Sequence, residues 1–326
     1  MIQLSIVIPS RNEEWLSETL EDLLKNKNDC TEIIAVIDGE EYPKSLPTHK
    51  DLTIIRRFES RGQRASTNEA ARIARGRYIM KTDAHTAWDK NFDLKILKCF
   101  EDLGDNITQV PIMRNLHVFD WVCSNGHRRY QGPSGTCPLC RAKEKKEVVW
   151  YPKPNPESTS YCFDNTLHFQ YFREWKKSDV YREQRKTGYT ESMSIQGSCF
   201  VLSKDKYWEL NICDEEFGSW GQQGVEVACK TWLSGGRVII NHNTWYGHLF
   251  RTQGGDFSFP YKQDEKKIEA AREFSRKLFL DNNWPLQKFP LSWLIEKFAP
   301  VPNWHNADNG MLDKVTDWGK SFKSML

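Results

Sequence analysis

The first third of the chain alternates short apolar runs with amphipathic segments. Residues 4–9 (LSIVIP) are rich in β-branched side chains and close on a proline, a pattern typical of a buried parallel strand. Between positions 15 and 24, five large apolar side chains recur at helical spacing, which predicts an amphipathic helix. Further strands are expected over residues 32–37, 52–55 and 78–82, and a further helix over residues 65–74. This order of elements predicts an open, mostly parallel α/β sheet that binds ligands beyond the carboxyl ends of its strands.

The rest of the chain has a less regular pattern. Residues 161–171 and 193–202 predict strands, and residues 262–280 predict a charged amphipathic helix. Residues 151–156 (YPKPNP) predict an extended linker. We expect a Rossmann-like sheet flanked by helices, in four parts: residues 1–115, the first half of the sheet; 116–150, an insert; 151–262, the second half; and 263–326, a helical C-terminal cap.

Composition limits the location and the partners. The 46 basic and 44 acidic residues nearly cancel, so net charge alone indicates no polyanionic partner. No apolar run is long enough to span a bilayer, and the chain begins directly with a strand, so we expect a cytoplasmic protein with no membrane partner. The nine cysteines, an odd number with three close together, fit a reducing compartment and a metal site better than disulfides.

An Asp-x-His pair follows the strand expected at residues 78–82. Side chains two positions apart leave a strand on the same side, so Asp83 and His85 form a potential chelate. A carboxylate oxygen and an imidazole nitrogen suit Mn2+, with Mg2+ as the alternative, and such an ion could hold the diphosphate of a nucleotide-sugar. A surface histidine beside a strand-end carboxylate is the competing interpretation.

The insert carries a second set of metal-ligand residues. Cys123, His127, Cys137 and Cys140 follow the spacing C-x3-H-x9-C-x2-C, which supplies the four ligands of a tetrahedral structural Zn2+. The surrounding cations are Arg128, Arg129, Arg141, Lys143, Lys145 and Lys146. The insert resembles small zinc ribbons that accompany DNA-acting enzymes. Its cations predict a large anionic partner such as DNA. The zinc site could equally serve only to stabilise an insertion that has little core of its own.

Several segments together carry a family resemblance. Residues 5–13 (SIVIPSRNE), 38–39 (DG), the arginine-rich helix and 82–85 (TDAH) resemble the nucleotide half of GT-A glycosyltransferases. The Asp-Ala-His form is similar to that of the polypeptide N-acetylgalactosaminyltransferases. Residues 220–227 (WGQQGVEV) and 246–251 (YGHLFR) resemble the acceptor-side and metal-completing segments of that family. The resemblance covers roughly residues 2–115 and 190–262 and implies the GT-A fold. It implies that residues 1–115 form the nucleotide-sugar half and residues 151–262 the acceptor half.

The resemblance also implies the roles of individual residues. His248 would complete the Mn2+ site with Asp83 and His85, with a core histidine as the plainer alternative. Apart from the resemblance, two glycines among aromatic residues predict a lid over residues 251–261, with a disordered surface loop as the alternative. Trp220, Gln223, Glu226 and Arg251 are expected at the sugar or the acceptor, with a core tryptophan and a helix-start glutamate as the plainer alternatives. The remaining donor-binding residues are expected to be Pro9, Arg11, Glu13, Asp38, Arg61, Arg64, Thr82 and Ala84. Of these, Arg11 or Glu13 would meet the uracil or ribose, Asp38 would lie near the nucleoside, and the Arg61 and Arg64 guanidinium groups match phosphate oxygens.

One departure from the family pattern bears on mechanism. Inverting relatives place an aspartate near position 224 as general base, whereas this chain has Gln222-Gln223-Gly224, and an amide cannot take up a proton at neutral pH. We therefore favour a retaining transfer of a hexose or N-acetylhexosamine from a UDP-sugar to a hydroxyl. The same substitution leaves the donor sugar open.

The favoured acceptor is a 5-hydroxymethylpyrimidine in DNA, with a protein Ser/Thr or a saccharide hydroxyl as alternatives. A nucleotidyltransferase would need additional carboxylates at the metal. A catalytically dead, zinc-stabilised nucleic-acid-binding protein is the non-enzymatic alternative.

Overall fold

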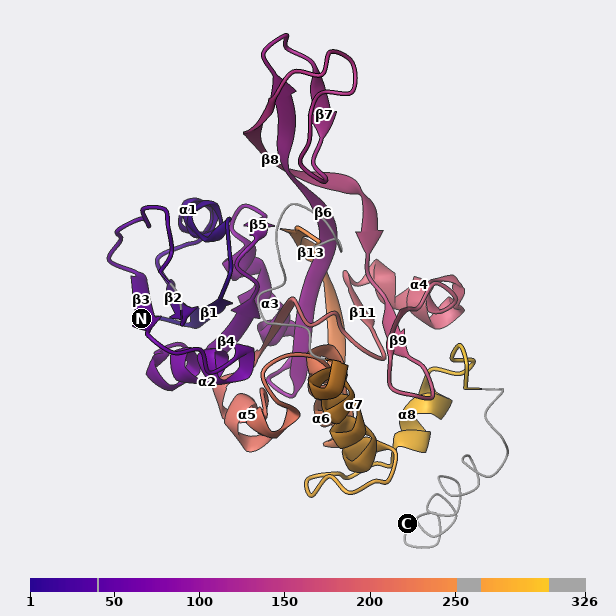
Figure 1. Ribbon diagram of the computed structural model, residues 1–326. Helices are drawn as coiled ribbons and strands as arrows, with labels where there is room; N and C mark the ends of the chain where they lie inside the picture. The colour runs from indigo at the N-terminus through magenta and orange to yellow at the C-terminus, as the bar shows by residue number, and fades with distance from the viewer. Residues whose placement is uncertain (40, 251–264, 305–326) are drawn as a thin grey trace, which may run out of the picture.

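The structure is a computed structural model that describes residues 1–39, 41–250 and 265–304. Its strands are β1 (Leu4–Ser10), β2 (Thr31–Asp38), β3 (Leu52–Arg57), β4 (Tyr78–Thr82), β5 (Thr86–Trp88), β6 (Ile107–Cys123), β7 (Arg128–Tyr130), β8 (Glu144–Ser158), β9 (Tyr161–Phe163), β10 (Phe169–Tyr171), β11 (Tyr189–Glu191), β12 (Cys199–Ser203) and β13 (Arg237–His248). Its helices are α1 (Leu16–Asn26), α2 (Gln63–Ile73), α3 (Phe92–Leu103), α4 (Asp179–Lys186), α5 (Lys204–Glu209), α6 (Gln223–Leu233), α7 (Glu265–Phe279) and α8 (Leu291–Lys297), with 3-10 turns η1 (Trp175–Lys177) and η2 (Glu215–Phe217). Most of the strands join one large sheet with helices on both faces (Figure 1).

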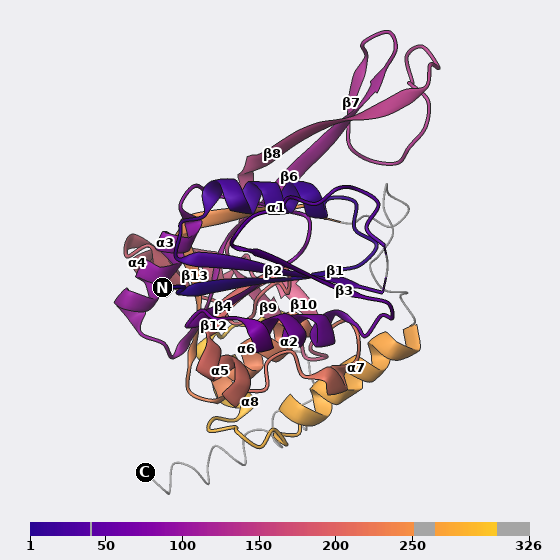
Figure 2. The same cartoon turned by 90° about the vertical axis from the view of Figure 1, so that its left-hand side faces the viewer.

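The N-terminal half of the sheet is parallel, as predicted. β1 pairs in parallel with β2 and β4, and β2 pairs in parallel with β3. Helix α1 covers one face of these strands and α2 the other (Figure 2), which explains why every residue of β1 is buried. The carboxyl ends of β1, β2 and β4 therefore meet at one edge, where Ser10, Asp38 and Thr82 lie.

The C-terminal half makes the sheet mixed. β12 lies antiparallel between β4 and β6, and β13 then pairs in parallel with β6. The expectation of a mostly parallel sheet therefore holds only for the first half. The strand expected over residues 193–202 also begins later, at Cys199. An apolar run such as that of β12 indicates burial on both faces but carries no information about strand direction.

The insert forms a long β-arm that projects from the body as a continuation of the inner strand β6 (Figures 1 and 2). We call residues 116–150 the arm; β6 and β8 are its two long strands and β7 lies beside β6. The linker expected over residues 151–156 is wrong, because these residues belong to β8, with Tyr151 opposite His117 and Pro152 opposite Leu116. Among the strands that the structure describes, β8 pairs with β6 alone, and such an edge strand tolerates prolines.

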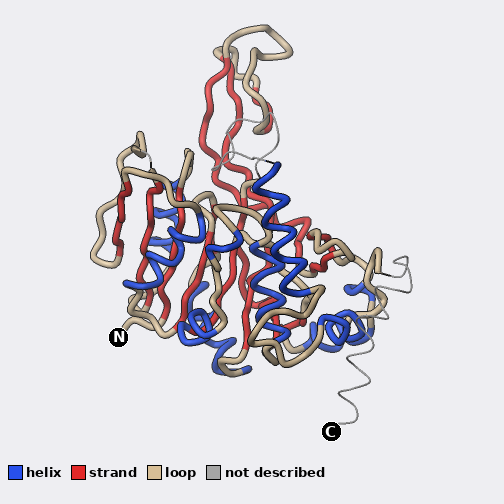
Figure 3. The backbone as a smooth tube through the Cα atoms, turned by 60° about the horizontal axis from the view of Figure 1, so that its bottom comes forward, coloured by secondary structure: helices blue, strands red, loops and turns tan. Residues whose placement is uncertain are grey.

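Helices α7 and α8 form a cap over α6, as expected (Figure 3). Trp232 of α6 contacts Trp293 and Phe298, with ring centres 6.1 and 5.5 Å apart. Trp304 donates from Nε1 to the Phe163 carbonyl at 2.9 Å, which ties the cap to the β9–β10 hairpin. None of the described helices has both the length and the apolarity needed to cross a bilayer. The four-part division of the chain stays a prediction. Strand β6 runs unbroken across the expected boundary between residues 115 and 116, from the sheet into the arm.

Candidate active site

Three potential metal ligands converge at the edge of the sheet. Asp83 follows β4, His85 precedes β5, and His248 ends β13. β13 pairs with β5, placing His248 opposite Thr86 and next to His85. Asp83 Oδ2 lies 3.3 Å from His248 Nε2 and 3.9 Å from His85 Nε2, and the three ligand atoms lie within 4.8 Å of one another. The three residues therefore lie together, as the sequence predicts.

Glu13 holds the ring of His85. Its Oε2 lies 2.8 Å from His85 Nδ1, and its Oε1 accepts from the Trp15 amide at 3.3 Å. A carboxylate on one ring nitrogen fixes the imidazole so that the other nitrogen, Nε2, faces Asp83. The expectation that Glu13 contacts the uracil or ribose is therefore wrong; it supports a metal ligand.

A buried lysine, missed in the sequence, stands behind Asp83. The Lys81 ammonium is fully buried, contacts Asp83 Oδ1 and donates to the Gly197 carbonyl at 2.9 Å. Lys81 therefore occupies one carboxylate oxygen and leaves Oδ2 facing the histidines. The available signal was a lysine inside an apolar strand, two positions before Asp83 and hence on its face.

The electrostatics suit cation binding. Burial opposes ionisation of Asp83, but Lys81 and the two histidines outweigh it and hold the pKa of that carboxyl well below its usual range. Burial lowers the pKa of His248 to about 4, so its ring is neutral at physiological pH and keeps a lone pair for a metal. One carboxylate oxygen and two imidazole nitrogens fit Mn2+ and leave coordination positions open for a substrate.

A cavity of about 590 Å3 lies beside Asp83. Trp220 and Gln223 line it, as predicted for residues near the sugar or acceptor. Its volume is within the range usual for small-molecule sites. The walls come from residues 168–171 of the β9–β10 hairpin, residues 195–198, residues 220–225 at the start of α6, and Gln63, Phe250, Ile268 and Arg272.

The tight packing of two backbone segments shapes one wall. A Cβ on Gly224 would lie 2.1 Å from the Ile195 carbonyl oxygen, so only glycine fits there. Gln222 caps α6 in the left-handed region at φ 57°. Packing therefore requires the glycine of the Gln222-Gln223-Gly224 sequence. The same three residues supply no carboxylate that could act as a general base.

The predicted roles of Arg64 and Glu226 are wrong. Both side chains are fully buried, and Arg64 Nε donates to Glu226 Oε2 at 3.0 Å. Arg64 also donates to the carbonyls of Gly218 and Gly221, at 3.2 and 2.6 Å, while Lys230 pairs with Glu226 at 3.2 Å. These residues hold the loop before α6 and offer no atom to a diphosphate or a sugar.

Asp38 also serves the protein backbone. Its carboxylate accepts from Ser60 Oγ and from the amides of Arg61 and Gly62, at 2.8 to 2.9 Å. Arg11 donates to the Asp38 and Gly39 carbonyls at 2.5 and 3.2 Å, which fixes the end of β2. Asp38 thus orders the loop that carries the exposed Arg61 side chain, and Arg61 stays a candidate for the diphosphate.

The remaining predicted residues divide into two groups. Pro9, Thr82 and Ala84 are buried at the strand ends, so they shape the site through the backbone rather than through exposed side chains. Arg251 and the lid expected over residues 251–261 lie outside the described residues.

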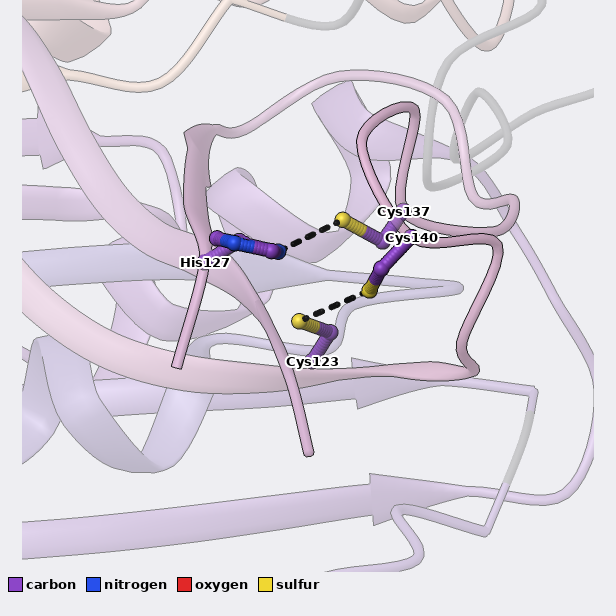
Figure 4. A group of neighbouring side chains, drawn as sticks. All are labelled: Cys123, His127, Cys137 and Cys140. Atoms are coloured by element: carbon purple, nitrogen blue, oxygen red, sulfur yellow. Dashed lines mark hydrogen bonds between the residues drawn. The ribbon is translucent and has the colours of Figure 1, made fainter. Parts of the chain in front are cut away.

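The second predicted ligand set also converges, at the tip of the arm (Figure 4). Cys123 Sγ lies 3.7 Å from Cys140 Sγ, and Cys137 Sγ lies 3.5 Å from His127 Nδ1. Zn–S bonds of about 2.3 Å in a tetrahedron put two sulfurs about 3.8 Å apart, so this spacing fits zinc. Backbone donation from Ala142 lowers the pKa of the Cys140 thiol, which favours the thiolate that a metal requires.

Comparison with known proteins settles the family. The model of the glycosyl transferase family 2 domain matches residues 5–210. The chain belongs to glycosyl transferase family 2. It is 23% identical over 287 residues to the putative polypeptide N-acetylgalactosaminyltransferase 13 of Drosophila melanogaster, covering 82% of this chain and 45% of that protein. It is 25% identical over 258 residues to human polypeptide N-acetylgalactosaminyltransferase 14, covering 76% and 40%. This family 2 chain thus spans less than half of either relative.

Solved structures establish the GT-A fold. GalNAc-T7, crystallised with UDP, GalNAc and Mn2+, superposes with a TM-score of 0.59 at 15% identity, covering 91% of this family 2 chain and 55% of that one. Residues 1–349 of S. aureus TarS give a TM-score of 0.50 at 11% identity, covering 91% and 70%. The GT-A fold that the motifs imply is therefore confirmed.

Proposed function

We propose that this protein is a metal-dependent glycosyltransferase that moves a sugar from a UDP-sugar to an acceptor hydroxyl. The observation that carries the proposal is the convergence of Asp83, His85 and His248, with ligand atoms within 4.8 Å, beside a cavity of about 590 Å3. The membership of family 2 supports a glycosyl transfer, and the GalNAc-T7 structure, which holds UDP, GalNAc and Mn2+, supports this donor class and metal.

The residues of the site have separable tasks. A Mn2+ or Mg2+ ion on the triad would neutralise the charge that develops on the leaving diphosphate. Glu13 orients His85, Lys81 fixes one oxygen of Asp83, and the exposed Arg61 is our candidate for contact with phosphate oxygens. Trp220 offers an apolar wall to a hexose or N-acetylhexosamine. Gln223 shapes the wall beside it, because its amide nitrogen donates to Cys213 Sγ at 3.1 Å and its amide oxygen is buried.

The cavity favours a retaining reaction. Among its described lining residues Asp83 is the only carboxylate, and its oxygens face Lys81 and the histidines. No carboxylate in this lining is left to act as general base toward an acceptor. In a retaining transfer the bond from the anomeric carbon to the phosphate oxygen breaks, the bond to the acceptor oxygen forms on the same face, and the acceptor proton passes to the departing phosphate.

The acceptor that we favour is a 5-hydroxymethylpyrimidine in DNA, because the arm carries exposed cations and its strand β6 pairs with β13 beside His248. A second candidate is a polypeptide Ser/Thr hydroxyl, which the names of the relatives favour. The two acceptors differ in charge and shape, so they can be separated directly.

The cluster at the arm tip is proposed as a structural zinc site. Its four ligands fill a tetrahedron and leave no open position, unlike the triad of Asp83, His85 and His248. Metal analysis of the purified protein should find one zinc per chain that resists dialysis against a weak chelator.

The function is tested with a panel of UDP-sugars and Mn2+, with UDP release as the readout and no acceptor present. Hydroxymethylated DNA, unmodified DNA and a peptide mixture are then added, and the mass gain of each is measured. We expect UDP release with at least one donor and a hexose or N-acetylhexosamine gain on hydroxymethylated DNA. Absence of UDP release with every donor, with or without acceptor, would refute the proposed glycosyltransferase activity. A mass gain on peptides alone would show that the acceptor is a polypeptide rather than DNA.

A further inference from the structure

The arm begins at the wall of the metal site. β6 pairs with β13 up to Asn115, which lies opposite the metal ligand His248, and then runs on into the arm. Figures 1 and 2 show the hairpin leaving the body at this point. The arm therefore grows from the same sheet edge that carries the proposed chemistry.

An apolar cluster fastens the root of the arm to that wall. Leu116 and Phe119 of the arm pack with Trp15, Ala87 and Leu249. These three body residues lie within two positions of Glu13, His85 and His248, respectively. The rings of Trp15 and Phe119 stack with centres 5.7 Å apart. The arm is thus held in a fixed relation to the metal site rather than hanging from a flexible joint.

Half of the cations of the arm are already neutralised. Arg128 pairs with Asp120 and Glu147, Arg129 pairs with Glu144, and Lys146 reaches Glu14 of the body at 2.6 Å. The arm is therefore less basic at its surface than its sequence indicates.

The other half remains unneutralised and forms a row. Arg141, Lys143 and Lys145 are exposed and have no carboxylate partner within the described residues. Lys145 lies in β8, and Lys143 lies just before β8 in a bridge with Thr136, so these two share a face about 6.6 Å apart. Arg141 precedes them in a turn, with φ 62°. Each nucleotide of a DNA strand carries one negative charge, so closely spaced cations can meet successive phosphates of one strand.

The distance between the row and the root of the arm, beside His248, limits the kind of partner that can contact both. Lys145 lies opposite Val122, seven residues beyond Asn115 along β6. At about 3.3 Å per residue this places the row roughly 23 Å from the start of the arm. A monosaccharide or a free nucleoside cannot touch both places, whereas a polymer can.

We propose that the row of Arg141, Lys143 and Lys145 is the docking surface for the phosphodiester backbone of a nucleic-acid acceptor, which the arm holds so that a modified base reaches the cavity. This inference rests on the proposed function. A backbone with one charge per nucleotide meets a regular row of cations at any sequence, whereas a peptide would need acidic residues at fixed positions.

The test compares two triple variants of the full-length protein. Arg141→Gln/Lys143→Gln/Lys145→Gln removes the row. Lys25→Gln/Lys90→Gln/Arg237→Gln removes the same charge from exposed positions away from the site, Arg237 being at the opposite end of β13 from His248. UDP release without acceptor, KM for a hydroxymethylated oligonucleotide, and oligonucleotide affinity by fluorescence anisotropy are measured from 50 to 300 mM salt.

The row variant should raise KM and the dissociation constant at least tenfold, lower the salt slope by about two to three, and leave UDP release unchanged. The control variant should match the wild type. Equal affinity and equal salt slope in the row variant and the wild type would overturn the docking surface, as would modification of peptides alone. Absence of UDP release in the wild type would instead refute the proposed function, so the two failures are distinct.

Discussion

The two metal-ligand clusters of this protein are built in opposite ways. Asp83 and His248 are 165 residues apart and meet only because β13 crosses the sheet to pair with β5. Cys123 and Cys140, at the arm tip, are 17 residues apart and meet within one hairpin. The first cluster depends on the whole fold, and the second depends on local spacing.

The surroundings of the two clusters differ in the same sense. The triad is backed by two buried residues, Lys81 of β4 and Glu13 of the loop between β1 and α1, and it keeps coordination positions open. The arm cluster has a full ligand set and little apolar core around it. In the first site the fold holds the ligands in place, so that a bound metal can act on a substrate. In the second site a bound metal would hold the fold of the arm tip in place.

The sharpest way to break the comparison is to remove one ligand from the arm. Cys137→Ser should release the zinc and unfold the tip, because a structural zinc contributes an apparent 10–16 kcal/mol, far more than so small an apolar core. Zinc content by mass spectrometry and protease cleavage within residues 123–140 measure this, with Cys30→Ser, outside the cluster, as the control. UDP release should change less than about threefold; its complete loss would show that the two clusters are not independent.

The reciprocal change is Asp83→Asn. The amide has no charge to offer a divalent cation, and it leaves the buried Lys81 ammonium without its carboxylate. We expect Mn2+ affinity and UDP release to fall more than about 100-fold, beyond the range reached by residues that stand behind metal ligands. Zinc content should stay at the wild-type value. Isothermal titration with Mn2+ is the direct measurement, and a variant within tenfold of the wild type would contradict the assignment of this ligand.

The same contrast explains what the sequence could predict. The zinc ligands follow from their spacing, because four ligands within 18 positions need no knowledge of the fold. Strands β1, β2, β3 and β4 also follow from local pattern, with boundaries within two residues. The joining of His248 to Asp83 could be expected only by family resemblance, since pairing between β5 and β13 is not written in any local pattern.

Buried polar groups are where prediction from sequence failed. The sequence predicts that Arg64, Glu226 and Glu13 face the donor or the acceptor, because charged side chains in a glycosyltransferase motif are expected to meet the substrate. In the structure they satisfy one another, the backbone or His85. Burial of a charge depends on partners that are distant in sequence, such as the 162 positions between Arg64 and Glu226. Lys81 was missed for the same reason.

A finer test of the triad concerns its support rather than its ligands. Glu13→Gln keeps an acceptor near His85 Nδ1 but removes the charge, so His85 becomes a weaker ligand. We expect Mn2+ affinity to fall 10- to 100-fold with zinc content unchanged. Glu14→Gln, the neighbouring carboxylate that pairs with Lys146 of the arm, is the matched control and should leave Mn2+ affinity within about twofold. Equal effects of the two variants would mean that general charge, not the orientation of His85, is being measured.

The smallest effect is expected in the pH dependence of the metal-free protein. Burial lowers the pKa of His248 to about 4, below the value of about 6.5 in an unfolded chain, so between these values the unfolded state binds the proton that the folded state refuses. The free energy of unfolding should therefore fall as pH drops from 6.5 toward 4, by up to about 1.4 kcal/mol per pH unit from this group. His242, whose pKa burial lowers to about 3, contributes in the same direction, so His248→Asn should reduce the slope without abolishing it. Urea denaturation in EDTA at pH 6.5, 6.0, 5.5 and 5.0 measures the two slopes. Equal slopes in the wild type and the variant would show that His248 is not a buried neutral ring. A protonated His248 would form an ion pair with Asp83 and would have no lone pair for a metal.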